Sequence, residues 1–259
     1  MTQKKTGDNT SKKKLYLRFS TSDDVKAIID FYQSNEHEYV AHRDIDIMKE
    51  RIESGAVTIV ECKDGKIHAA SISYAIEKDG EHKWTEVGST RISLNGLKGD
   101  GYSLFDVLVS AQKVRAFLLE PPEDHFVIEI DVDNKSSQFV FERLGCQSFD
   151  NAPPEITEAA ESTMAPEDTG VPIKWYQFGL EGIPGLAKNL INSSKKPILI
   201  QKGTGIEYEL DFSKNQLNIM FKEHIKHLSK QDFCNITEQN SNKGLAKGHG
   251  DIHRKIYKP

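Results

Sequence analysis

The stretch NKSSQFVFERLGC, residues 134–146, decides the fold class. It follows HFVIEIDVD (residues 125–133), whose β-branched and aromatic content predicts a strand. Between residues 135 and 145 the apolar positions have helical spacing, and Gly145 is a typical helix stop. The sequence therefore predicts a strand that leads directly into a short amphipathic helix.

A glycine-rich turn lies upstream, in LNGLKGDGYSLFDVLVSAQ (residues 94–112), before an apolar helix expected to run to about Leu119. Gly96, Gly99 and Gly101 let backbone N–H groups approach an anion, and a helix N-terminus adds partial positive charge. Alone this signal is weak, because such loops are more often tight connections. A GxGxxG dinucleotide turn competes, but it requires a parallel βαβ unit, whereas the preceding strands indicate an antiparallel meander.

The rest of the core follows from turn signals and periodicity. Residues 56–95 are β-prone and are cut at Asp64-Gly65 and Asp79-Gly80, which predicts three antiparallel strands. Strands and helices are also expected on either side of these segments: strands over 15–21 and 171–180, and helices over 24–35 and 44–54. The order of elements predicts an α+β (mixed α/β) class, with a central mixed sheet flanked by helices.

Composition limits the class of protein. The 259 residues carry a net charge of −5, with 37% hydrophobic and 28% charged residues, which argues against non-specific nucleic-acid binding. No apolar run approaches the ~20 residues of a membrane span. The N-terminal residues lack the apolar region of a secretory signal. The three cysteines have no metal-ligand spacing and are typical of reduced thiols. We therefore expect a cytoplasmic protein without metal, nucleic acid or membrane.

The expected domain organisation has four parts. Residues 1–14 are predicted to be a disordered basic lead, and residues 15–181 the main domain, with a mobile acidic loop over 151–170. Residues 182–235 are predicted to be a small α+β C-terminal appendage, with a hairpin that turns at 202–205 and a helix over 215–231, and residues 236–259 a disordered tail. The appendage has three open roles: covering an acceptor site, forming a homodimer or binding another protein.

The stretch that begins at Asn134 resembles a motif of the GNAT superfamily of acyl-CoA-dependent N-acyltransferases. That family carries an Asn, a small residue three positions on and an aromatic residue, usually Tyr, seven positions on. Glu-Lys/Arg-Leu-Gly-Phe follows. Asn134, Ser137 and Phe141 take the first three places, and residues 142–145 read Glu-Arg-Leu-Gly.

Two other segments extend the resemblance. The glycine turn is similar to the family's Arg/Gln-x-x-Gly-x-Gly/Ala pattern, with Gly99 and Gly101 at the glycine positions. Arg18 and Asp24 match the family's Arg-x-x-x-x-x-Asp pair at the first strand and helix. The resemblance covers about residues 15–180, and its most specific part is the motif from Asn134.

The resemblance implies a fold and a reaction. It implies a GNAT-like sheet in which two parallel strands splay, and an acyl group transferred from acetyl-CoA, or another acyl-CoA, to a primary amine of a small molecule, peptide or protein. The amine attacks directly, and the enzyme supplies proximity, carbonyl polarisation by a backbone N–H and proton handling. The implied cofactor-binding residues are Ile92, Ser93, Leu94, Leu97, Lys98, Gly99, Asp100, Gly101, Tyr102, Asn134 and Phe141.

Glu86 is the residue that we expect to act as a general base. It lies shortly before the glycine turn, near where some family members place a catalytic Glu. The alternative is an exposed strand carboxylate paired with a cation such as Arg91. Glu129 and Asp131 are rivals on the next strand, although alternation puts both on one face with Asp133, where all three would be solvated. Many family enzymes use water instead.

Two residues depart from the family's pattern. Gly96 stands where the family has Arg or Gln; Lys98 can supply the lost charge, whereas Asp100 opposes phosphate unless it points away. Phe141 replaces a Tyr that can protonate the leaving thiolate. A thiol has a pKa of about 8.5, so its thiolate is a tolerable leaving group without protonation. Alternatively, Tyr102 donates the proton. Two further interpretations stay open: a catalytically silent GNAT-fold CoA-binding or protein-interaction module, and a long-chain N-acyl synthase, which would need a wide apolar cleft.

Overall fold

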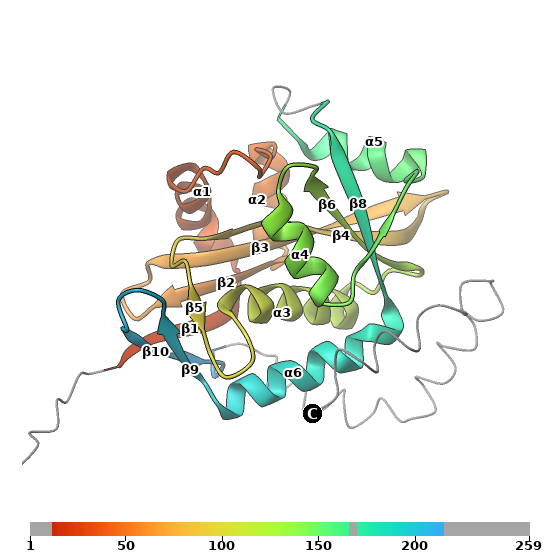
Figure 1. Ribbon diagram of the computed structural model, residues 1–259. Helices are drawn as coiled ribbons and strands as arrows, with labels where there is room; N and C mark the ends of the chain where they lie inside the picture. Colours follow the sequence, from red (N-terminus) through yellow and green to blue (C-terminus); the bar gives the residue numbers. More distant parts are fainter. Residues whose placement is uncertain (1–11, 166–169, 215–259) are drawn as a thin grey trace, which may run out of the picture.

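The computed structural model describes residues 12–165 and 170–214. Within them one mixed sheet runs through the molecule in the strand order β5-β9-β10-β1-β2-β3-β4-β6-β8-β7 (Figure 1). The strands are β1 (Lys13–Phe19), β2 (Val57–Cys62), β3 (Ile67–Lys78), β4 (Glu81–Ile92), β5 (Leu97–Lys98), β6 (His125–Asp131), β7 (Gln147–Phe149), β8 (Ile173–Gly179), β9 (Ile198–Gln201) and β10 (Glu207–Asp211). The helices are α1 (Val25–Ser34), α2 (Ile45–Glu53), α3 (Leu104–Leu119), α4 (Lys135–Arg143), α5 (Pro154–Thr163) and α6 (Ile183–Lys195), with short 3-10 turns at η1 (Ser22–Asp24) and η3 (Leu180–Gly182). The predicted mixed α/β class is confirmed.

The middle of the sheet is the antiparallel meander that the turn signals predict. β2 pairs with β3, and β3 pairs with β4, both antiparallel. Asp79 and Gly80 have positive φ angles of 56° and 79°, the backbone of a two-residue hairpin turn that favours Asp-Gly. The prediction of three strands over residues 56–95 is therefore confirmed.

Helices cover both faces of this meander. Val60 and Val87 belong to the apolar core that also contains residues of α3 and α6. Ile59 and Ile72 belong to a second core, with residues of α1 and α2. Because successive side chains of a strand point to opposite faces, α3 and α6 lie on one face, and α1 and α2 on the other (Figure 1).

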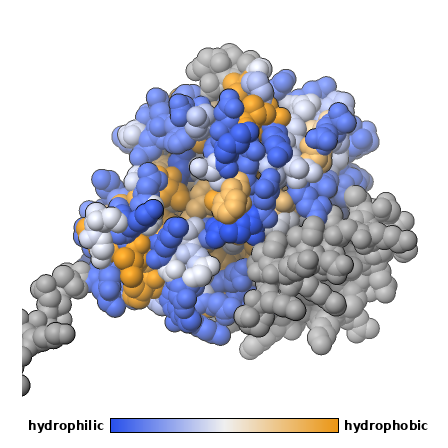
Figure 2. Space-filling model, viewed as in Figure 1, coloured by the Kyte–Doolittle hydropathy of each residue, from blue (hydrophilic) through white to orange (hydrophobic). Residues whose placement is uncertain are grey.

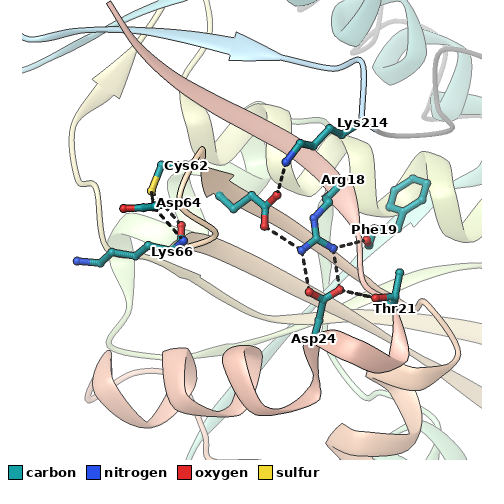
Figure 3. Close-up of polar contacts among 9 residues, drawn as sticks. Arg18, Phe19, Thr21, Asp24, Cys62, Asp64, Lys66 and Lys214 are labelled. Atoms are coloured by element: carbon teal, nitrogen blue, oxygen red, sulfur yellow. Dashed lines mark hydrogen bonds and ion pairs between the residues drawn. The ribbon is translucent and has the colours of Figure 1, made fainter.

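The expected Arg18–Asp24 pair fastens β1 to the start of α1 (Figure 3). The Arg18 guanidinium donates to both Asp24 carboxylate oxygens at 2.7 Å and to Glu61 Oε2 on β2 at 2.8 Å. Asp24 also accepts from the Thr21 N–H at 2.8 Å, and Lys214 Nζ donates to Glu61 Oε1 at 2.8 Å. Burial acts to raise the pKa of Asp24, but the hydrogen bonds from Arg18 and Thr21 outweigh it and lower that pKa.

The described part of the C-terminal region extends the same sheet. β10 pairs in parallel with β1, β9 pairs with β10, and β5 pairs with β9. The predicted hairpin turn over 202–205 is present between β9 and β10. Ile200 and Ile206 are exposed there, and Figure 2 shows an apolar patch over the hairpin. β1 begins at Lys13, inside the predicted disordered lead. The predicted helix over 215–231 lies outside the described residues, as does the tail.

The prediction of a mobile acidic loop over 151–170 is wrong for most of that segment. It contains α5, which begins with Pro154 at a position where the missing N–H is tolerated. Ile156 and Ala160 are one helical turn apart, and both are buried. Ile156 packs in an apolar cluster that includes Trp84. Tertiary packing of two apolar residues therefore outweighs the polar composition. No helix in the described part of the chain is long and apolar enough to span a bilayer.

Candidate active site

A gap opens between the parallel strands β4 and β6. They pair only from Trp84 to Glu86 and from His125 to Val127. Beyond this point a cavity of about 440 Å³ lies between them, bounded by residues 87–90 of β4, residues 128–131 of β6 and the loop at 36–43. The splay between two parallel strands that the resemblance implies is therefore present.

β4 contains a bulge where it borders the gap. Its register with β3 shifts between Ala70 and Ile72, so that β4 has one extra residue. Ser89 has a φ of 47°, a left-handed conformation that non-glycine residues rarely adopt. Bulges bend a strand, re-aim its groups and are common beside active sites. Gly88, Ser89 and Thr90 line the cavity, so the bulge brings backbone to its wall.

Neighbouring side chains hold the bulge. The Tyr32 hydroxyl donates to the Ser89 carbonyl at 2.6 Å, and Arg43 Nε donates to Ser89 Oγ at 3.2 Å. A Cβ at Gly88 would lie 2.6 Å from Glu86 Oε1, so any larger residue would displace that carboxylate. Glycine at this position therefore allows a charged cluster to sit directly behind the bulge.

That cluster consists of Arg43, Glu86 and Glu129. Arg43 donates to Glu86 Oε1 at 2.6 Å and lies 3.6 Å from Glu129 Oε2. The three side chains are 5%, 1% and 6% exposed. Burial raises the pKa of Glu129 to about 7, the charge of Glu86 acts in the same direction, and Arg43 opposes both. Glu129 Oε2 has no hydrogen-bond partner in the described part of the chain. A carboxylate with this pKa can take up a proton near neutral pH.

The predicted base candidates differ in whether their side chains line the cavity between β4 and β6. Glu86 is buried behind the bulge and does not line the cavity, whereas Glu129 and Asp131 do. The cation that Glu86 contacts is Arg43, because Arg91 donates instead to the backbone carbonyls of Tyr32 and two loop residues. The alternative of an exposed Glu86 and the alternative of a solvated Glu129 are both wrong, since the two side chains are buried together.

A second cavity, of about 820 Å³, continues from the first. The two share wall residues from the loop, from β4, from α3 and from the start of α4: His37, Glu38, Tyr39, Val40, Thr90, Phe105, Asn134 and Ser137. The second cavity follows the end of β4 and the segment into β5, opposite residues 133–137. It brings together five predicted cofactor residues: Ile92, Leu94, Leu97, Lys98 and Asn134.

The glycine turn is held by contacts within itself and with Lys196, the residue that follows α6. The Gly99 N–H donates to the Tyr102 carbonyl at 2.8 Å, and a Cβ at Gly99 would lie 2.5 Å from the Tyr102 ring. The Tyr102 hydroxyl donates to the Lys196 carbonyl, and Lys196 Nζ contacts Asp100. Asp100, Gly101 and Tyr102 therefore face a separate cavity of about 790 Å³ against α6, away from the other predicted cofactor residues.

The N-terminus of α3 keeps donors for a ligand although it is capped. Ser103 and Asp106 form a capping box, in which Asp106 Oδ2 accepts from the Ser103 N–H at 2.7 Å. Within residues 12–165 and 170–214, no contact takes up the N–H of Leu104 or Phe105. Both residues line the second cavity. Among the described contacts, their two amides are therefore unpaired donors at the N-terminus of α3.

The motif from Asn134 has a structural explanation. The Asn134 side chain caps α4 by accepting from the Ser137 N–H at 3.1 Å. Phe141, one of the predicted cofactor residues, lines the first cavity and packs edge-to-face on Phe105 at 5.6 Å. The remaining predicted residue, Ser93, is turned away from both cavities and donates to the His68 carbonyl at 3.2 Å.

Sequence reasoning missed Arg43 and the loop around it. No motif marks this loop, which joins two predicted helices, and its importance depends on contacts with residues far along the chain. Arg43 also contacts Thr163 and the Ala160 carbonyl of α5, the helix that the sequence did not predict. In the described residues, no group of three His, Cys, Asp or Glu side chains is arranged to hold a metal ion.

No family model and no curated protein matches the chain, but solved structures do. Rv2747 from Mycobacterium tuberculosis, in complex with CoA and NLQ, is 14% identical with a TM-score of 0.45, over 63% of this chain and 98% of that one. An acetyltransferase of the GNAT family from Streptococcus pneumoniae is 11% identical with a TM-score of 0.44, over 64% and 98%. Drosophila melanogaster polyamine N-acetyltransferase is 12% identical with a TM-score of 0.45, over 64% and 100%. The chain is thus distantly similar to solved acetyltransferases, which include one of the GNAT family.

Proposed function

We propose that this chain is an N-acyltransferase that transfers an acyl group, most simply acetyl from acetyl-CoA, to a primary amine. One observation carries the proposal: β4 and β6 are parallel, pair over three residues each and then separate around a cavity that continues into a long groove. Such a gap can hold a thioester and an amine in contact while excluding bulk water. Holding two reactants in an attack geometry is a large part of the rate enhancement of acyl transfer.

The groove suits an acyl-CoA, which when bound supplies the acyl group as an activated thioester. The free N–H groups of Leu104 and Phe105 and the charge of Lys98 would hold its phosphates. Ile92 and Leu94 would lie beside its extended arm. The backbone at the Ser89 bulge would polarise the acyl carbonyl.

Glu129 is the general base in this proposal, in place of Glu86. It lines the cavity between the strands, and its pKa is raised to about 7 by burial and by the charge of Glu86. A base with that pKa can accept the ammonium proton of the acceptor, directly or through water, and release it near neutral pH. Arg43 balances one of the two carboxylate charges, so Glu86 serves to tune the pKa of Glu129.

The leaving thiolate receives no proton from the residue at the family's tyrosine position. Phe141 lines the cavity but has no proton to give, and the Tyr102 hydroxyl is engaged with the Lys196 carbonyl on the other side of the loop. Thiols have pKa values of about 8.5, so a thiolate leaves without protonation at a modest loss of rate. The proposed enzyme therefore works without a dedicated acid.

The cavity also favours a cationic acceptor and a short acyl group. Glu36, Glu38, Glu129 and Asp131 stand in its wall, and an ammonium group is attracted to such a surface. A long acyl chain would need a wide apolar cleft, whereas Arg43 and Glu129 occupy this gap. The proposed acceptor is a primary amine of a small molecule, a peptide or a protein.

A binding measurement and a turnover measurement test the proposal together. Calorimetric titration with CoA should give a binding isotherm, and release of free CoA thiol from acetyl-CoA should depend on an added amine such as a diamine or an aromatic amine. Gly88→Leu, whose side chain would displace Glu86 and Arg43 behind the bulge, should abolish thiol release, while Lys26→Met on α1 should alter neither signal. Absence of CoA binding at millimolar concentration contradicts the proposal.

A catalytically silent CoA-binding module is the second candidate, and Phe141 and Gly96 favour it. It predicts a normal CoA isotherm with no thiol release on any amine. Phe141→Tyr then separates the two candidates: an active enzyme should gain rate when a proton donor is restored, and a silent module should not.

A further inference from the structure

Lys113 and Cys146 form an isolated pair inside the protein. Lys113 lies on α3 and is fully buried, and Cys146 lies between α4 and β7 with 4% exposure. Lys113 Nζ is 3.1 Å from Cys146 Sγ. The proposed acyl transfer uses neither residue, and no sequence motif marks them.

The surroundings of this pair are aromatic instead of acidic. Lys113 Nζ lies 4.3 Å from the ring centre of Phe178 and 5.5 Å from that of Phe141. No carboxylate forms an ion pair with Lys113 in residues 12–165 and 170–214. A buried ammonium without a counter-charge is strongly disfavoured. The Cys146 thiol is therefore the polar side chain that lies against this amine among the described contacts.

The pair combines a nucleophilic sulfur and a nucleophilic nitrogen at contact distance. Burial raises the pKa of Cys146, and the nearby Lys113 acts in the opposite direction. An oxidised cysteine sulfur is an electrophile that condenses with a neighbouring nucleophile, and nitrogen is one that forms a sulfenamide. Because no other thiol among the described residues lies beside Cys146, the amine is the only adjacent nucleophile that could trap it.

We propose that Lys113 and Cys146 are a peroxide-sensitive modification site that closes into a sulfenamide cross-link. The Cys146 sulfur attacks one oxygen of hydrogen peroxide, the O–O bond breaks, and one water leaves as the sulfenic acid forms. The Lys113 nitrogen then attacks that sulfur, an N–S bond forms, the S–O bond breaks, and a second water leaves with a proton from the amine. Sulfur is oxidised and peroxide is reduced, and the protein loses two hydrogen atoms in total. A thiol reductant reverses the reaction.

The cross-link would join α3 to the turn between α4 and β7. Phe141, which lines the cavity between β4 and β6, lies against the Lys113 amine on one side and Phe105 on the other. Shortening the nitrogen–sulfur separation from contact distance to a covalent bond would shift the support of this ring. The modification therefore connects oxidant exposure to the wall of the candidate active site, whether or not the site transfers acyl groups.

Mass spectrometry of the full chain after hydrogen peroxide treatment tests the site. Wild-type protein should yield a peptide pair joined between Lys113 and Cys146, lighter than its two parts by two hydrogen atoms and released by dithiothreitol. With dimedone, which captures sulfenic acids, added together with denaturant after the peroxide so that both thiols are accessible, Cys62 should be labelled and Cys146 should not, because the amine has already trapped it.

The matched variants are Lys113→Met and Lys113→Arg, whose folding is checked by thermal melting. Both remove the condensing amine, and the second keeps the positive charge, so in both Cys146 should become labelled by dimedone at least tenfold more than in wild type. Equal labelling of Cys146 in wild type and variants, or a wild-type chain without the joined peptides, overturns the proposal.

Discussion

Two arginines in this protein each face two carboxylates, and the two clusters behave in opposite ways. Arg18 lies between Asp24 and Glu61 at the start of the sheet, and Arg43 lies between Glu86 and Glu129 at the gap between β4 and β6. Each cluster places one arginine against two carboxylates. The pKa values of Asp24 and Glu61 are lowered, whereas the pKa of Glu129 is raised to about 7.

Hydrogen bonding and burial explain the difference. Both carboxylates of the Arg18 cluster accept short hydrogen bonds, and Lys214 adds a second positive charge. In the Arg43 cluster only Glu86 accepts a short bond from the arginine, while Glu129 Oε2 lies 3.6 Å away and has no hydrogen-bond partner among the described residues. A satisfied cluster stabilises the fold. An incompletely satisfied one keeps a carboxyl group ready to take up a proton, a property that is common at functional sites.

The largest expected effect separates the clusters by activity. Glu129→Gln should lower kcat/KM for amine acylation by ~10²–10⁴-fold, because general base catalysis contributes about that much. The measurement is thiol release at saturating acetyl-CoA. Glu61→Gln is the matched control from the Arg18 cluster and should leave kcat/KM within about twofold. Equal losses in the two variants would mean that Glu129 acts only through stability.

The second-largest expected effect distinguishes the two clusters by their contribution to the stability of the fold. Arg18→Met should lower the free energy of unfolding by about 2–3 kcal/mol, somewhat less than the 3–5 kcal/mol of a fully buried pair, because Arg18 is 19% exposed. Urea denaturation followed by circular dichroism measures it. Lys26→Met, which breaks an exposed pair with Asp30, should change stability by less than about 0.5 kcal/mol. A small effect at Arg18 would remove its assigned role of fastening β1 to α1.

A smaller effect concerns the pH profile of the reaction. In wild type kcat/KM should fall as pH drops below about 7, because Glu129 must be deprotonated to act. Glu86→Gln removes the neighbouring negative charge and leaves Arg43 to Glu129 alone, so the acidic limb should move to lower pH by on the order of one unit. An acidic limb that does not move in this variant would assign the titration to another group.

The sequence predicted most of the fold because the fold depends on local signals. The Asp-Gly turns, the helical spacing after Asn134 and the Arg18–Asp24 pair all lie within short segments, and each was confirmed. α5 was missed because its stability comes from Ile156 packing against the distant Trp84, which no local pattern reveals.

The candidate site was only partly predictable for the same reason. Ile92, Leu94 and Asn134 meet in one groove because they flank predictable elements. The choice between Glu86 and Glu129 depends on a one-residue bulge and on Arg43, which approaches from a loop without a motif. The glycine-rich turn also has an explanation other than anion binding. A Cβ at Gly99 would lie 2.5 Å from the Tyr102 ring, so packing alone favours glycine there.

The smallest effect is the pH dependence of stability, in which the clusters should oppose each other. The folded-state pKa values of Asp24 and Glu61 are lowered, so their stabilisation is present above the ordinary carboxyl range and is lost as pH falls through those lowered values. The folded-state pKa of Glu129 is raised, so its contribution is fully present below pH ~4.3 and is lost as pH rises toward about 7. Glu129→Gln should therefore flatten the decline in unfolding free energy between pH 5 and 7.5, while Glu61→Gln should leave that decline and reduce the loss at more acidic pH. Urea titrations at matched ionic strength measure both, and a decline that survives in Glu129→Gln would show that Glu129 does not carry the raised pKa.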